Sequence, residues 1–267
     1  MYKMFIPATL LTLLTATSAL AEHKLLVTDV PDPGHVEARI DFDYTKETGK
    51  NFFLENVSAE RIGSTVTVAA GVINGLKVSA TLPYTFKQRV EGVKENGFED
   101  LTLGARYSLT KSLVKLPVDI AVGFDWKLDS ARRNDPGTRD NSYSPSVAVS
   151  KNLHMFIPYV VYQPEFIIHA HDGQTIHNLT VGTEIEFSHH YSLDVKVKES
   201  FNGSRGDIKA SNTFEVEVGP YINVFKNLYL LPTVSYAVIG DVETKLGEKL
   251  LQKADGYKIG FGMYYLF

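Results

Sequence analysis

The sequence has 267 residues, a formal net charge of −4 and 44% hydrophobic residues, and it contains 14 Tyr and 15 Phe but no Cys. The absence of Cys excludes a disulfide framework, a thiolate metal site and a thiol nucleophile. The charged residues form no basic block or stripe, so the sequence offers no electrostatic surface for nucleic acid. Composition leaves open a soluble β-sandwich and a membrane β-barrel, whose two interfaces would use the many aromatic residues.

The N-terminus has the pattern of a secretory signal peptide. Lys3 precedes an apolar run over residues 5–14, and small residues follow it up to Ala19-Leu20-Ala21. This run is shorter than the ~20 apolar residues that a membrane-spanning helix needs. We therefore expect a signal peptide over residues 1–21, cleaved near Ala21, and export of the mature chain.

From about residue 35 the chain alternates apolar with polar or small side chains, as β-strands with two different faces do. The segment 36–44 places Val, Ala, Ile, Phe and Tyr on one face and Glu, Arg and two Asp on the other. Nearly every such segment has the length of a membrane-spanning strand, whereas sandwich strands usually have only ~5 or 6 residues. We expect about twelve strands. They are centred on residues 36–46, 62–73, 76–89, 99–110, 117–129, 142–150, 155–169, 176–187, 191–202, 212–224, 228–239 and 256–267.

The connections between these strands alternate between short and long. Short turns are expected at Asn74-Gly75, Lys151-Asn152, His189-His190 and Lys226-Asn227, with a somewhat longer one at 111–116. The longer links are rich in Gly, Asn, Asp, Lys and Arg and cover 46–60, 90–98, 130–141, 203–211 and 240–255. This rhythm is typical of periplasmic turns and extracellular loops, and an even number of strands leaves both termini in the periplasm.

The sequence therefore predicts an all-β protein of the Gram-negative cell outer membrane. The fold would be a closed antiparallel transmembrane β-barrel over residues 35–267, with short periplasmic turns and longer extracellular loops. A periplasmic N-terminal segment over residues 22–34 would precede the barrel. Sequence alone leaves open whether the loops 46–60 and 240–255 fold inward as plugs.

The C-terminal strand carries the most specific local signal. Alternate residues from 257 to 267 form one unbroken apolar face that ends in a terminal Phe. This face resembles the recognition signal of outer-membrane barrels, in which a terminal aromatic residue, an aromatic residue two places earlier and a glycine further back guide folding by the barrel assembly machinery. Phe267, Tyr265 and Gly262 match these positions, while Gly260 stands where a polar residue is usual. The resemblance implies that the assembly machinery is a partner.

A narrower resemblance is to a group of exported barrels named after the MetA pathway of phenol degradation. The chain is similar to this group in its mature start, EHKLLVTDVPDPGHVEARIDFDY, and in the pair VSATLPYTF and NGFEDLTLGARYSL. The group often has Gly-x-Gly-Asp where this chain has Gly97-Phe98-Glu99-Asp100. The resemblance implies an outer-membrane channel or uptake barrel, in some cases for aromatic compounds.

The polar face of each strand would line the lumen of such a barrel. Acidic candidates are Glu37, Asp41, Asp43, Asp100, Asp119, Asp125, Glu184, Glu186, Asp194, Glu215 and Glu217. Basic candidates are Arg39, Lys77, Lys87, Arg106, Lys127, Lys196, Lys198 and Lys258. This mixture of signs differs from a single-sign selectivity filter. Pairing around 203–211 would set Lys196 opposite Glu217 and Lys198 opposite Glu215, as ion pairs that stiffen a narrow barrel or as part of a substrate track.

Two candidate chemical sites have weak support. Glu37, Asp41 and Asp43 lie on one strand face and could bind a cation or act as paired acid and base, since residues i and i+2 on one face are about 7 Å apart. Arg39 between Glu37 and Asp41 would neutralise them. His169 and His171 share one strand face with ligand-like spacing, although a solvated rim explains them better. We expect no metal and no cofactor.

A lipid-modifying enzyme of the outer membrane is the less favoured alternative. Ser200 lies in a stretch that faintly resembles a phospholipase strand, but Lys198 stands where that strand carries its His. The sequence contains no Gly-x-Ser-x-Gly, phosphate-loop or His-Glu-x-x-His motif. We therefore expect that the protein is not an enzyme.

The leading functional prediction is passive passage of small solutes, with aromatic or hydrophobic compounds as the version that the resemblance implies. The alternative is a non-conducting structural or surface-recognition barrel, whose Arg132, Arg133 and Arg139 would contact lipopolysaccharide phosphates. The expected partners are outer-membrane lipid, lipopolysaccharide, the barrel assembly machinery and a small-molecule solute, and no nucleic acid.

Overall fold

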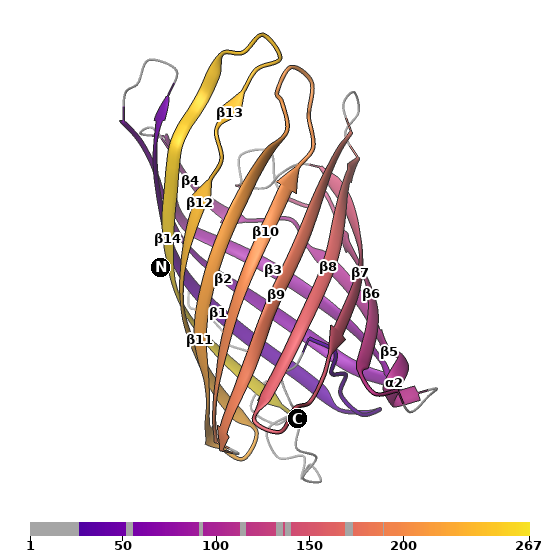
Figure 1. The fold of residues 1–267 in the computed structure, drawn as a ribbon. Helices are drawn as coiled ribbons and strands as arrows, with labels where there is room; N and C mark the ends of the chain where they lie inside the picture. Colours follow the sequence, from indigo (N-terminus) through magenta and orange to yellow (C-terminus); the bar gives the residue numbers. More distant parts are fainter. Residues whose placement is uncertain are drawn as a thin grey trace.

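The computed structural model describes residues 27–51, 56–90, 93–112, 116–131, 136, 140–168, 173–188 and 190–267, so the expected signal peptide lies outside the described residues. Twelve antiparallel strands form a closed β-barrel (Figure 1), which confirms the predicted fold. These strands are β1 (Val36–Asn51), β2 (Asn56–Ile73), β3 (Leu76–Val90), β5 (Thr102–Ser108), β6 (Asp119–Lys127), β7 (Asn141–Ser150), β8 (Phe156–Ile168), β9 (Gln174–Ser188), β10 (Tyr191–Asn202), β11 (Ser211–Phe225), β12 (Leu228–Ile239) and β14 (Lys249–Leu266). Two short strands, β4 (Val93–Phe98) and β13 (Val242–Glu243), extend the wall, and α2 (Leu109–Ser112) follows β5.

The first and last strands close the barrel. β1 pairs with β14 in antiparallel register from Glu37 opposite Leu266 to Asn51 opposite Leu251. Each of the other barrel strands pairs with its neighbours along the chain, and this up-and-down order leaves no free sheet edge in the ring. Among the described residues, no helix has the length and apolar character that crossing a membrane requires.

The distribution of side chains is inverted relative to that of a soluble sandwich. Phe86 and Trp126 are 50% and 47% exposed, whereas Ser142 and Ser150 are each only 1% exposed. Small hydroxyl side chains thus occupy the interior, and large apolar side chains cover the outside, where they contact lipid in a transmembrane barrel. This inversion decides between the two fold classes that composition left open.

Several segments predicted as loops are partly strands. β1 and β2 continue to pair as far as Lys50 opposite Asn56, so most of 46–60 belongs to the wall. The predicted loop 90–98 contains β4, which pairs with β3, and 240–255 forms β13 with the first part of β14, a hairpin that prolongs the wall at the loop end of the barrel (Figure 1). The helix α2 includes the first two residues of the predicted turn 111–116. Beyond the membrane both strand faces meet water, so backbone pairing continues there without the alternation that marks a strand.

A β-bulge in β3 corrects one predicted lumen residue. Gly63 pairs with Thr85, whereas Ile62 pairs with Lys87, so Phe86 is the extra residue. A shift of one residue moves the following side chains to the other face of the sheet. Lys87 therefore shares the outer face with Ile62, and the prediction that it lines the lumen is wrong.

Candidate functional site: the barrel lumen

The barrel encloses a cavity of about 920 Å³ that is lined by inward-facing polar side chains. The predicted candidates that line it are Glu37, Arg39, Asp41, Lys77, Arg106, Asp125, Lys127, Glu184, Asp194, Lys196, Lys198, Glu215, Glu217 and Lys258. Asp43, Asp100, Asp119 and Glu186 lie outside this lining. Asp43 binds Arg61, and Asp100 accepts hydrogen bonds from the backbone N–H groups of Ser130 and Ala131.

One charged cluster joins β8, β10 and β11. β10 and β11 pair in the predicted register, with Lys196 opposite Glu217 and Lys198 opposite Glu215. The Lys196 Nζ atom lies 2.8 Å from Glu217 Oε1 and 3.4 Å from Asp194 Oδ2, which confirms the first predicted ion pair. The Tyr159 hydroxyl donates a hydrogen bond of 2.8 Å to Asp194. This part of the wall is therefore polar but locally close to neutral.

Further ion pairs line the rest of the cavity. Lys77 Nζ lies 3.5 Å from Glu37 Oε2, and Lys127 Nζ lies 3.1 Å from Glu165 Oε1. The Arg39 guanidinium donates two hydrogen bonds of 2.7 and 2.8 Å to Asp41, which is the neutralisation that the sequence predicts. Opposite charges are thus held side by side around the wall.

Three charged groups of the cavity differ from these pairs. Within the described part of the chain, the side chains of Lys198, Lys258 and Glu215 make neither a salt bridge nor a hydrogen bond, although all three line the cavity. The register alone therefore does not bring Lys198 and Glu215 into an ion pair. Charged groups without a protein partner are free to interact with ions and polar solutes in the lumen.

β7 supplies three small hydroxyl side chains to the lining. Ser142, Ser144 and Ser146 all line the cavity, and Gly123 of β6 lies beside them. A Cβ atom on Gly123 would lie 2.5 Å from the Ser146 hydroxyl oxygen, so glycine is needed for the serine to keep its position. Small side chains on this wall leave space in a barrel whose strand number allows only a narrow interior.

The N-terminal segment Val27–His35 lies in the end of the barrel that carries the short turns. The Arg106 guanidinium donates a 2.9 Å hydrogen bond to the carbonyl oxygen of Val27, and the hydroxyls of Thr28 and Ser150 are 2.7 Å apart. Gly34 N–H donates to the carbonyl oxygen of Gly71, and Gly71 N–H donates to that of His35. The segment thus reaches from β2 to β7 and narrows the periplasmic end of the lumen.

The sequence predicted this segment only as a periplasmic extension. One signal was nevertheless present, because an isolated glycine inside a strand often marks close approach of another backbone. Gly71 has this role: a Cβ atom there would clash with the carbonyl oxygens of Pro31 and Asp32. Val30 and Pro31 are buried in this position.

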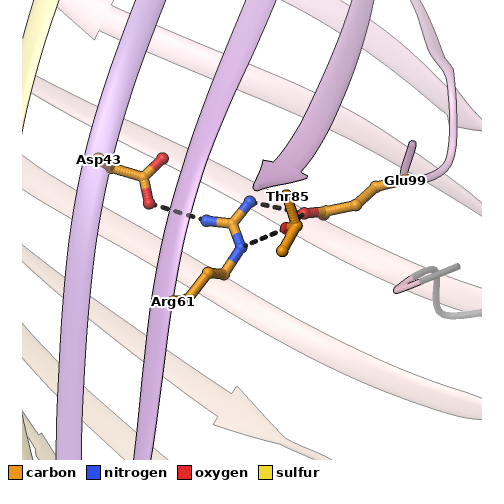
Figure 2. Close-up of polar contacts among 4 residues, drawn as sticks. All are labelled: Asp43, Arg61, Thr85 and Glu99. Atoms are coloured by element: carbon orange, nitrogen blue, oxygen red, sulfur yellow. Dashed lines mark hydrogen bonds and ion pairs between the residues drawn. The ribbon is translucent and has the colours of Figure 1, made fainter. Parts of the chain in front are cut away.

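A second polar network near the loop end of the barrel is centred on Arg61 of β2 (Figure 2). Its guanidinium lies 2.8 Å from Asp43 Oδ2 and 2.6 Å from Glu99 Oε1. It also donates to the Thr85 hydroxyl, which in turn donates to Glu99. These contacts connect β1, β2 and β3 with the link between β4 and β5, to which Glu99 belongs. No single local sequence pattern predicts them.

Replacing Arg61 with Leu should destabilise the folded barrel by about 1–3 kcal/mol, because Asp43 and Glu99 would lose their shared cation in a partly buried site. The measurement is urea unfolding of the refolded protein in lipid vesicles. Arg89→Leu is the matched control, since the Arg89 side chain makes no hydrogen bond or salt bridge with a described residue. An equal loss of stability in both variants would show that the network contributes nothing.

The other predicted sites lie partly outside the described residues. His169, His171, Arg132, Arg133 and Arg139 are not described. Among the residues that are described, no group of three His, Asp or Glu side chains has metal-binding geometry. The Ser200 hydroxyl donates a 2.6 Å hydrogen bond to Asn178.

Comparison with known proteins supports the fold. No family model and no curated protein matches the sequence, so membership of the MetA-pathway group stays a prediction. Among solved structures, the chain is similar to the COG4313 outer membrane channel from Pseudomonas putida F1, with a TM-score of 0.72 and 10% identity over 91% of this chain and 99% of that one. It also resembles the translocator domain of autotransporter NalP from Neisseria meningitidis, with a TM-score of 0.52, 10% identity and coverage of 88% and 89%. The NanC porin has a TM-score of 0.51, 11% identity and coverage of 83% and 98%.

These similarities agree with the closed ring of strands. At this level of identity they establish the architecture alone. The chain is a β-barrel of the outer-membrane type.

Proposed function

We propose that the protein is an outer-membrane channel that allows passive diffusion of small polar solutes. The observation that carries this proposal is the cavity of about 920 Å³, in which paired charges alternate with small hydroxyl side chains. An interior that served only to stiffen the barrel would be filled by interlocking side chains, as small barrels often are. Serine and glycine at these positions leave room for solvent instead.

The chemistry of the lining favours polar solutes over hydrocarbons. A solute in the lumen meets carboxylates, ammonium groups and hydroxyls, so hydroxylated or zwitterionic molecules can exchange hydrogen bonds with water for hydrogen bonds with the wall. An apolar solute would remove water from these groups without replacing their hydrogen bonds. The aromatic uptake implied by the MetA-group resemblance is therefore most compatible with aromatic acids.

A liposome-swelling assay tests this proposal and its solute class. Vesicles that contain the folded barrel should swell in solutions of small sugars, amino acids or aromatic acids, at rates that fall as solute size increases. Protein-free vesicles and vesicles with a heat-unfolded sample are the controls. Swelling no faster than in protein-free vesicles for every solute would contradict the proposal.

The free lysines of the lumen should influence ion selectivity. Replacing Lys198 and Lys258 with Met removes two cations from the cavity and leaves Glu215 in place, so we expect permeability to shift toward cations. The reversal potential across a KCl gradient measures this shift. Lys87→Met is the matched control because Lys87 lies on the outer face, and an equal shift in the control would contradict a role of the lumen lysines.

A non-conducting structural barrel is the second candidate, and the N-terminal segment is the observation that favours it. The segment occupies the periplasmic end of the lumen through contacts with Arg106, Ser150 and Gly71. If it fills that end completely, the cavity is a closed chamber. The two candidates differ in whether displacement of the segment is needed for any current to flow.

A further inference from the structure

A row of charged side chains crosses the outer face of the barrel near its loop end. Direct cross-strand partners place Tyr257 of β14 opposite Lys46 of β1, Lys46 opposite Glu60 of β2, Glu60 opposite Arg89 of β3, and Arg89 opposite Lys94 of β4. Directly opposed residues project from the same face of a sheet. Lys87 joins this face one step below, opposite Ile62. We call Lys46, Lys87, Arg89 and Lys94 the basic row.

The basic row lies on the outside of the barrel. Tyr257 and Ile62, which share its face, are 42% and 41% exposed. The Arg61 side chain, which follows Glu60 in β2, points to the other face and binds Asp43 there (Figure 2). The row is therefore separated from the lumen by the sheet itself.

Aromatic side chains form a band directly below the basic row. The rings of Tyr44 and Tyr257 are 6.0 Å apart, and the ring of Tyr84 lies 5.0 Å from Phe86 and 4.9 Å from Phe98. Aromatic girdles mark the level at which the hydrocarbon layer meets the headgroups. The basic row thus lies at the headgroup level on the extracellular side of the membrane.

The electrostatics of the row call for an anion. Arg89 and Lys94 are direct cross-strand partners, an arrangement of like charges that destabilises a sheet by itself. Glu60 is the one carboxylate in the row, and the side chains of the four cations make no hydrogen bond or salt bridge with any residue that the structure describes. Asp255, two residues before Tyr257 in β14, adds a second carboxylate to this face, where it accepts a hydrogen bond from the exposed Tyr236 hydroxyl. Among the described residues, four cations against these two carboxylates leave a net positive surface above an apolar one.

We propose that the basic row binds the phosphate groups of lipopolysaccharide in the outer leaflet, while the aromatic band below contacts its acyl chains. Arginine binds phosphate through two parallel hydrogen bonds, and lysine binds it as a point charge. A lipid fits both surfaces at once. Its phosphates lie at the headgroup level, where the cations are, and its acyl chains begin just below, where the aromatic rings are. This site is independent of the channel function, since it lies on the other side of the wall.

The test compares lipopolysaccharide binding by the folded barrel in detergent with that of the variant Arg89→Gln/Lys94→Gln. The matched control is Lys151→Gln/Lys226→Gln, which removes the same charge from exposed turns at the opposite end of the barrel. The probes are purified lipopolysaccharide, the same lipid after enzymatic removal of its phosphates, and inorganic phosphate. A heat-modifiability gel confirms that every sample is folded, and Lys94→Gln alone replaces the double variant if that fails to fold.

We expect affinity for intact lipopolysaccharide to fall about tenfold or more in the Arg89→Gln/Lys94→Gln variant, because charge-assisted hydrogen bonds to phosphate are lost. The control should bind like the wild type, and the dephosphorylated lipid should bind the wild type as weakly as intact lipid binds the variant. Equal binding by wild type and variant, or equal binding of the two lipids, would overturn the proposal. Inorganic phosphate that binds as tightly as the lipid would also overturn it, since the site would then recognise a free anion.

Discussion

Displacing the N-terminal segment should increase the single-channel conductance several-fold. Gly71→Ala is the sharpest change, because the new Cβ atom would collide with the carbonyl oxygens of Pro31 and Asp32, which belong to the segment backbone. The strand around Gly71 is fixed by pairing with β1 and β3, so the segment is the part that must move. With the periplasmic end of the lumen open, its access resistance falls.

Planar-bilayer recordings of wild type and variant at equal salt measure this increase. Gly173→Ala is the matched control, since its Cβ atom would meet only the Ile167 carbonyl oxygen, at an ordinary contact distance of 3.6 Å. A second variant, a refolded chain that begins at Pro33, removes residues 27–32 of the segment, which make its contacts with Arg106 and Ser150, without changing the wall. Unchanged conductance in both variants would show that the segment does not restrict the passage.

The loss of Phe267 should abolish most assembly in cells while leaving refolding in detergent almost unchanged. We propose that Gly262, Tyr265 and Phe267 form the signal read by the assembly machinery. In the folded barrel, Phe267 contributes one 2.8 Å backbone hydrogen bond to Val36 and a ring contact with Tyr265 at 4.6 Å. One such hydrogen bond is worth only about 0.5–1.5 kcal/mol, too little to prevent folding of a closed barrel.

The experiment quantifies folded barrel in outer-membrane fractions for wild type, Phe267→Ala and Phe225→Ala. Phe225 is a matched control because it is also an aromatic residue near the turns, and it is 70% exposed. We expect a severe loss for Phe267→Ala and near-normal levels for Phe225→Ala. A similar loss of folded barrel in both variants would indicate that assembly needs aromatic residues at this rim in general. That result would contradict a specific C-terminal signal.

The sequence predicts those features that depend on contact with the membrane or on neighbouring strands. Alternation is enforced wherever one face meets lipid, so the strand centres and the C-terminal strand were predictable. The pairing of Lys196 with Glu217 followed because the two strands are consecutive and their register is short-range. The strand ends on the loop side were not predictable in this way. Residues such as Lys50 and Asn56 continue the backbone pairing in water, where the sequence shows no apolar–polar alternation.

Features that depend on distant contacts were not predictable from local patterns. The bulge at Phe86 changes the face of Lys87, and the apolar–polar alternation alone gave no sign of that shift. Arg61 meets Asp43 of β1 and Glu99 of the link between β4 and β5, and each of these residues also fits an ordinary lumen position. The position of the N-terminal segment inside the barrel end depends on its contact with Gly71, which is distant in the sequence.

The most direct test of the channel function is single-channel conductance of the refolded wild-type barrel in a planar bilayer, with and without small sugars and aromatic acids. We predict discrete openings whose current falls when a polar solute that fits the cavity is added. A correctly inserted barrel that stays silent, both as wild type and as Gly71→Ala, would contradict the account and identify the cavity as a closed chamber.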